Sequence, residues 1–132
     1  MQKTVKIRGE DVQVEVAGNA TETELHETAL EMYRKQHDIV SPDELREFRG
    51  RMGISGKDFA ALMGFSQTTI VAYENGTLPT DNNNVQLKAS LTDKHFLEHF
   101  YEENQEKLSA KARRKVAEYL DTYQYLDDAA WL

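Results

Sequence analysis

Five neutral side chains between residues 67 and 72 have the chemistry to contact the edges of nucleic-acid bases. They comprise an amide, two hydroxyls and two small apolar groups: Gln67, Thr68, Thr69, Val71 and Ala72. In the DNA major groove an amide can form two hydrogen bonds with adenine, and a methyl group can contact the methyl of thymine. On the outer face of one helix, these side chains would serve as base contacts. The alternative is a helical hairpin whose polar face meets only water.

Two short helices joined by a tight turn would position this face. Ser55 and Ser66 each precede apolar residues at helical spacing, and serine there typically caps a first helical turn. Gly64 would end the first helix, and Asn75 with Gly76 the second, because these residues tolerate a left-handed backbone. Apolar pairs that flank the caps would fix the entry angles: Ile54 with Phe59, and Phe65 with Ile70.

A third helix is predicted directly before these two. Ser41 can cap it, Pro42 suits its first position, and Glu44 can bond back to the cap. Its apolar residues recur at helical spacing up to Gly53: Leu45, Phe48 and Met52. Three consecutive helices, each opened by serine and closed by glycine, favour the core of a DNA-binding domain.

The remaining segments predict a mainly α-helical chain in three parts. Residues 1–20 predict a β-hairpin, because apolar and polar or charged residues alternate in two runs between Thr4 and Val16; it either binds a partner strand or covers its own chain. Residues 21–104 would form a five-helix DNA-binding domain, opened by a capping box at Thr21, with a polar loop at residues 81–84 before a helix at 85–91. Residues 105–132 carry an amphipathic helix that can pack on its own chain or form a dimer. Trp131 and Leu132 would be tucked in or anchor a partner.

Composition limits the class of protein. The 132 residues carry a net charge of −7 and no cysteine, which excludes disulfides and thiolate zinc sites. We expect a cytoplasmic protein without a membrane partner, because no segment resembles a signal peptide or a membrane span. The acidity opposes DNA binding through bulk charge. A local basic set ahead of residue 66 would offset it: Arg46, Arg49, Arg51 and Lys57.

Catalytic and metal-binding chemistry finds little support. His95 and His99 are four residues apart, which is metal-ligand spacing, but no third histidine is near and a solvated or packed pair is the simpler interpretation. There is no nucleophile elbow and no glycine-rich phosphate loop. We predict no enzymatic activity, no metal and no cofactor.

The segment SPDELREFRGRMGISGKDFAALMGFSQTTIVAYENGTLPT resembles the helix-turn-helix of the phage-repressor superfamily. With TVKIRGEDVQVEV and EMYRKQHDIVSPDEL ahead of it, residues 3–104 are similar to the MqsA-type antitoxins of bacterial toxin-antitoxin loci. The resemblance implies that the five-helix domain is repressor-like, with a buried ion pair between Arg49 and Glu74. It implies base contacts from Gln67, Thr68 and Ala72, and phosphate contacts from Ser66, Asn75 and Thr77, to which we add Lys57 from the basic set.

Two departures from that family matter. MqsA-type antitoxins hold zinc with paired cysteines around the hairpin, and a cysteine-free chain cannot hold zinc in that way. Gly56 stands where the superfamily usually has a glutamine that touches phosphate and supports the recognition helix. A glycine there should also disfavour the helix, by up to ~1 kcal/mol.

Three functions follow from these features. The first is a dimeric repressor that binds its double-stranded operator DNA and acts as the antitoxin of a type II toxin-antitoxin pair, regulating its own operon and binding its cognate toxin. The second is a stand-alone phage or mobile-element repressor. The third is a protein-interaction module that neutralises a toxin without binding DNA.

Overall fold

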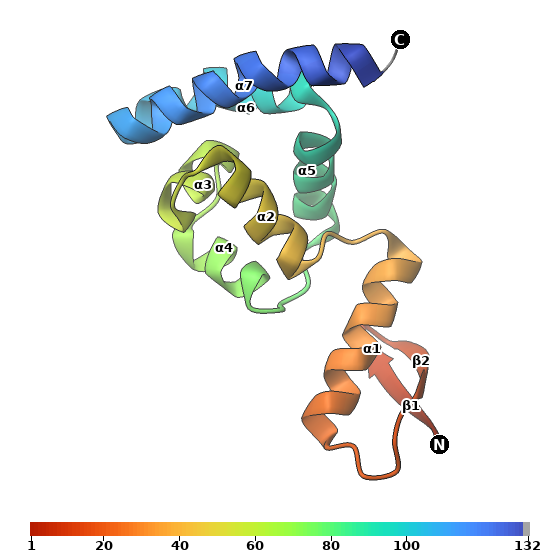
Figure 1. Ribbon diagram of the computed structural model, residues 1–132. Coiled ribbons are helices and arrows are strands. Elements are labelled where there is room, and N and C mark those ends of the chain that lie inside the picture. Colours follow the sequence, from red (N-terminus) through yellow and green to blue (C-terminus); the bar gives the residue numbers. More distant parts are fainter. Residues whose placement is uncertain (131–132) are drawn as a thin grey trace. The chain divides into compact units, whose positions relative to one another are not determined.

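The computed structural model describes residues 1–130, with side chains as far as residue 122. It contains two compact units, Met1–Ile39 and the chain from Val40 onward. Helix dominates, with seven α-helices among the described residues (Figure 1), none of them long and apolar enough to cross a lipid bilayer. The roles predicted for Trp131 and Leu132 fall outside the described residues.

The first unit begins with an antiparallel β-hairpin. Strands β1 (Gln2–Ile7) and β2 (Glu10–Glu15) pair so that Val5 lies opposite Val12. The two-residue turn between them, Arg8 and Gly9, has φ values of 50° and 82°. Positive φ at both positions gives a turn whose twist matches that of the paired strands, and it explains the glycine.

Helix α1 (Glu22–His37) covers the hairpin on one face (Figure 1). Its predicted capping box is confirmed, since the Thr21 hydroxyl accepts from the Glu24 amide at 3.1 Å and the Glu24 carboxylate accepts from the Thr21 amide at 3.0 Å. The apolar core of the unit is made by both elements: Ile7, Val12, Val14, Ala29 and Tyr33. The sequence pattern places this helix in the DNA-binding domain, whereas the structure groups it with the hairpin, because its apolar face packs on the strands.

As far as it is described, to residue 130, the second unit contains helices and connecting loops (Figure 1). Its elements are α2 (Pro42–Met52), α3 (Gly56–Met63), α4 (Gln67–Glu74), α5 (Asp81–Thr92), α6 (Lys94–Asn104), a 3₁₀ turn (Gln105–Lys107) and α7 (Ala110–Ala130). Phe48 and Phe59 meet edge to face at 5.7 Å at the centre of one core. Residues 21–104 hold six α-helices instead of the predicted five: α1, which groups with the hairpin, and the five helices α2 to α6. Asp93 ends α5 and caps α6.

Helix α5 starts earlier than predicted. Residues 81–84 were expected to form a loop, but they are its first turn, capped by Thr80, whose hydroxyl accepts from the Asn83 amide at 3.2 Å. The asparagine side chains bond to other elements: Asn83 donates to the Tyr73 hydroxyl at 2.8 Å, and Asn84 accepts from the Val40 amide at 2.9 Å. Asparagine disfavours helix by competing for nearby backbone, and these tertiary partners remove that competition.

The first half of α7 packs on its own chain. Ala112, Val116 and Leu120 are buried in the core of the second unit, and Tyr119 meets the Phe48 ring at 6.3 Å. The sequence left open whether this apolar stripe packs within the chain or forms a dimer. The stripe is covered within the chain as far as Leu120, whereas Tyr123 and Leu126 lie beyond the residues whose side chains are described.

Candidate nucleic-acid interface

The turn between α3 and α4 is fixed by hydrogen bonds. Gly64 ends α3 with φ of 75°, and the amide of Phe65 donates to the carbonyl of Ala60 at 2.8 Å. The hydroxyls of Ser55 and Ser66 accept from the third amide of α3 and of α4, at 3.1 Å in each case. The direction in which α4 leaves the turn is therefore set by the local chain, as the sequence predicted.

Helix α4 has one buried face and one open face. Ile70 and Tyr73 are buried at 0% and 6% exposure and join α4 to the core. On the other side Gln67, Thr68 and Val71 are exposed, whereas Thr69 and Ala72 are half-buried at the margin. The structure thus places the five predicted base-facing side chains on the open face of α4 or at its margin, and three of them are exposed.

The hydroxyls of Ser66 and Thr69 are hydrogen-bonded to each other. Their oxygens lie 2.8 Å apart, and the Ser66 oxygen also caps α4. Since both hydroxyls have partners at the start of the helix, Gln67 and Thr68 are the exposed hydrogen-bonding side chains of the first turn of α4.

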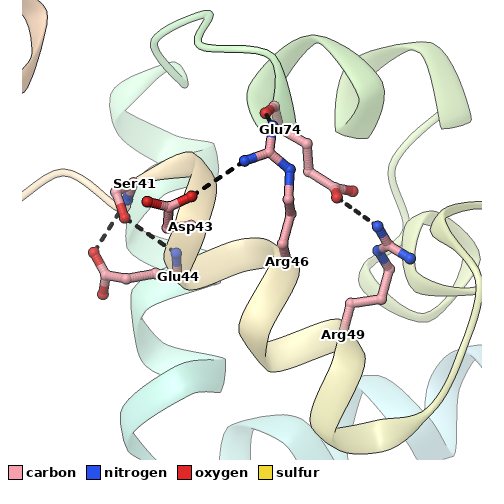
Figure 2. A network of polar contacts seen from close by, with 6 residues as sticks. All are labelled: Ser41, Asp43, Glu44, Arg46, Arg49 and Glu74. Atoms are coloured by element: carbon pink, nitrogen blue, oxygen red, sulfur yellow. Dashed lines mark hydrogen bonds and ion pairs between the residues drawn. The ribbon is translucent and has the colours of Figure 1, made fainter.

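Two arginines of α2 hold the far end of α4 (Figure 2). Arg49 Nη2 lies 2.7 Å from Glu74 Oε1, and the Glu74 side chain is only 9% exposed. Arg46 donates to the backbone carbonyl of Glu74 and to the Asp43 carboxylate, the latter at 3.2 Å. Both cations meet the C-terminal end of α4, where the helix dipole is negative. The ion pair that the family resemblance implied is present and connects α2 to α4.

The basic set ahead of α4 is not one free surface. Arg46 and Arg49 are engaged with Glu74, and the Arg51 guanidinium lies 5.9 Å from the centre of the Phe48 ring. Lys57 is exposed on the first turn of α3 and makes no ion pair with any described residue. These residues are close together in the sequence, but their tertiary contacts differ. The three arginines contact other residues of the second unit, whereas Lys57 is on the surface.

The other predicted phosphate contacts lie at both ends of α4. Ser66 is exposed at its start, and Asn75 and Thr77 are exposed beyond its end. The Thr77 amide donates to the carbonyl of Ala72 at 2.9 Å, so the chain leaves α4 in a hydrogen-bonded turn. These positions flank the open face of the helix.

Gly56 occupies the first position of α3 with room for a side chain. A Cβ built there would meet Glu74 Oε2 at 3.9 Å, an ordinary van der Waals contact. The absence of a side chain is therefore not required by close packing. Glycine at this position leaves a gap beside the ion pair of Glu74.

The described residues offer no metal site, and two hollows of the second unit lie away from α4. Within the described part of the chain, no group of three or more histidine, cysteine, aspartate or glutamate residues could hold a metal ion. His95 and His99 instead lie near single glutamates of α6, at 3.7 Å and 3.3 Å. Two hollows of about 70 and 370 Å³ are lined by other parts of the second unit, and neither includes an α4 residue.

A scan against protein families matches residues 45–86 to the family described as Helix-turn-helix. The two helices joined by the tight turn, α3 and α4, lie inside this match. The match runs from α2 into α5, and it supports a DNA-binding role for the segment that holds the open face of α4. Neither a search of curated proteins nor a search of solved structures found a match to the chain.

Proposed function

We propose that this protein is a transcriptional repressor that binds double-stranded operator DNA through α4, and that it is the antitoxin of a bacterial type II toxin-antitoxin pair. The observation that carries the DNA-binding part is the neutral, open face of α4, held rigidly by the serine caps and the Arg49–Glu74 ion pair. Such a helix can enter a major groove without ordering itself on binding, which limits the entropic cost of recognition.

Each side chain on this face has a role in the proposal. The exposed Gln67 would hydrogen-bond an adenine, and Thr68 would hydrogen-bond a neighbouring base. Thr69 and Ala72 would contact thymine methyl groups. The Thr69 hydroxyl would donate to Ser66, which leaves the Ser66 hydroxyl proton for a phosphate. Phosphate contacts around them would come from four exposed residues: Lys57, Ser66, Asn75 and Thr77.

The antitoxin role is supported by the resemblance of the hairpin and α1 to the corresponding part of MqsA-type antitoxins. A cognate toxin would bind this chain and change how strongly the operon is repressed. We also propose a homodimer, because one α4 reads only a few base pairs and two copies related by a two-fold axis would read a palindromic operator. The expected site of action is the cytoplasm.

A gel-shift assay on the DNA upstream of the gene tests the recognition surface. Gln67→Ala should weaken binding to that DNA by about 1 to 3 kcal/mol, roughly 5- to 150-fold, and relax preference at one base position, without changing the free energy of unfolding. Gln36→Ala makes the same change on the exposed surface of α1 and serves as the control. Equal operator affinity for the two variants would contradict the assignment of α4 as the recognition helix.

Co-expression tests the antitoxin role. If the open reading frame next to this gene stops growth when expressed alone, and growth returns when this chain is co-expressed, the antitoxin role is supported. A harmless neighbour combined with intact operator binding would instead favour a stand-alone repressor. Rescue of growth by a chain that binds no DNA would favour a pure interaction module.

A further inference from the structure

The residues that lead into α7 concentrate positive charge in an acidic protein. Between residues 105 and 115 there are five cations and one acid, whereas residues 116–132 contain four acids and no lysine or arginine. We refer to residues 107–115 as the basic segment. Its cations are Lys107, Lys111, Arg113, Arg114 and Lys115. The last helix is thus positive where it begins, and its own dipole adds to that charge.

Contacts fix the basic segment beside the start of the helix-turn-helix. The amide and the hydroxyl of Ser109 both donate to the Asp58 carboxylate of α3, each at 3.1 Å. Lys115 donates to the carbonyl of Gly53, in the loop between α2 and α3, at 2.9 Å. Figure 1 shows the beginning of α7 on the side of α3 and its end over α5. The segment therefore lies near the turn of α3 that carries Lys57.

Three of its cations are available for a partner. Lys107, Lys111 and Arg114 are exposed and make no ion pair with a described residue, while Arg113 donates to the Gln105 carbonyl at 3.1 Å. Lys111 and Arg114 are three residues apart and so neighbour each other on the outer face of α7. Because Ala112 and Val116 are buried in the core, that face is held in place by packing.

We propose that the basic segment binds the phosphate backbone of the same DNA duplex that α4 reads, outside residues 45–86. This proposal rests on the proposed DNA-binding function. The proposal is supported by the contacts of the predicted basic set. Arg46 and Arg49 bond to Glu74 and Arg51 lies against Phe48, so Lys57 is the member of that set for which no such contact is seen. Neutralising phosphates takes several cations, and the basic segment supplies them next to Lys57.

The test uses the full chain with two duplexes, one selected by the wild-type protein from a randomised pool and one scrambled duplex of equal length. We expect Lys111→Gln with Arg114→Gln to lower the slope of log affinity against log salt by about 2, because each phosphate contact contributes about 0.9. At 0.1 M salt this is a loss of up to about 60-fold. The ratio between the two duplexes should stay unchanged, since phosphate contacts carry no base information.

Lys3→Gln with Lys35→Gln is the matched control, because it removes the same charge from exposed positions of the first unit. The proposal is overturned if the α7 variant keeps the wild-type salt slope, or if the control variant loses as much affinity and slope. The proposed function fails differently: the wild-type protein would select no duplex, or Gln67→Ala would bind the selected duplex as tightly as wild type. Circular dichroism of the α7 variant checks that its helices remain folded.

Discussion

Replacing Glu74 by glutamine tests how much the ion pair between α2 and α4 contributes to stability. The carboxylate is 9% exposed and lies 2.7 Å from Arg49, whose side chain is 29% exposed. Removing one partner of a fully buried ion pair costs about 3 to 5 kcal/mol, because the other charge is left unpaired. Arg49 can be partly rehydrated and glutamine keeps one acceptor oxygen, so we expect a loss of about 2 kcal/mol in the free energy of unfolding.

Urea unfolding of the full chain measures this loss. Since the chain has two units, the transition should be followed through a signal from the second unit, such as the methyl resonances of the buried Ile70. Asp43→Asn is the control, because it also removes a carboxylate paired with an α2 arginine, but that side chain is 96% exposed. Exposed pairs contribute little, so the control should barely change stability.

The result that would refute the reasoning is a Glu74→Gln variant as stable as Asp43→Asn. A second check is the double variant Arg49→Met with Glu74→Gln, which removes both charges. It should recover part of the stability lost in the single variant, because no unpaired buried charge remains. If the losses in the free energy of unfolding from the two substitutions simply added, Arg49 and Glu74 would not be energetically coupled, contrary to their short contact.

Further predictions concern Gly56 and the core of the first unit. Gly56→Ala should raise the free energy of unfolding by up to about 1 kcal/mol in the same urea assay, since the position is helical and has room; a loss of stability would show that α3 needs glycine at its start. Val14→Ala should cost the first unit about 2 kcal/mol by leaving a cavity, measured through resonances of Tyr33, whereas adding a metal chelator should leave that unit unchanged. Unfolding by the chelator would show that the unit depends on a metal.

The sequence predicted best what depends on neighbouring residues. Both capping boxes, at Thr21 and Ser41, could be found from residues three positions apart, because the hydrogen bonds that define them join the same residues. The serine caps and the glycine at the α3–α4 turn are local in the same sense. All the residues that form these caps lie within one helical turn of each other. Their hydrogen bonds can therefore be predicted without knowing the tertiary contacts.

The sequence failed where a distant partner decides the outcome. The start of α5 was missed because Asn83 and Asn84 bond to Tyr73 and to the Val40 amide, which local propensity cannot register. Arg46, assigned to a DNA-facing set, instead donates to the backbone carbonyl of Glu74, which lies 28 residues away in the chain. The Arg49–Glu74 ion pair spans 25 residues, and only the family resemblance implied it. The charge of residues 107–115 was visible in the sequence, but its place was not, because the Ser109–Asp58 contact spans 51 residues.

The first unit of this cysteine-free chain has a packed apolar core. In zinc-dependent folds the metal supplies the free energy that a small core lacks, and this unit of residues 1–39 is small enough to need such help. Here Val12 and Val14 are 2% and 0% exposed, and the strands that carry them pack against Ala29 and Tyr33 of α1. The His37 ring also lies 2.6 Å from the Glu10 carboxylate and stacks on Tyr33, joining the end of the helix to β2. Because apolar burial and these contacts occur together, we expect the hairpin to keep its shape without a metal, which the chelator experiment tests. The absence of cysteine is therefore no argument against a partner-binding role for this unit.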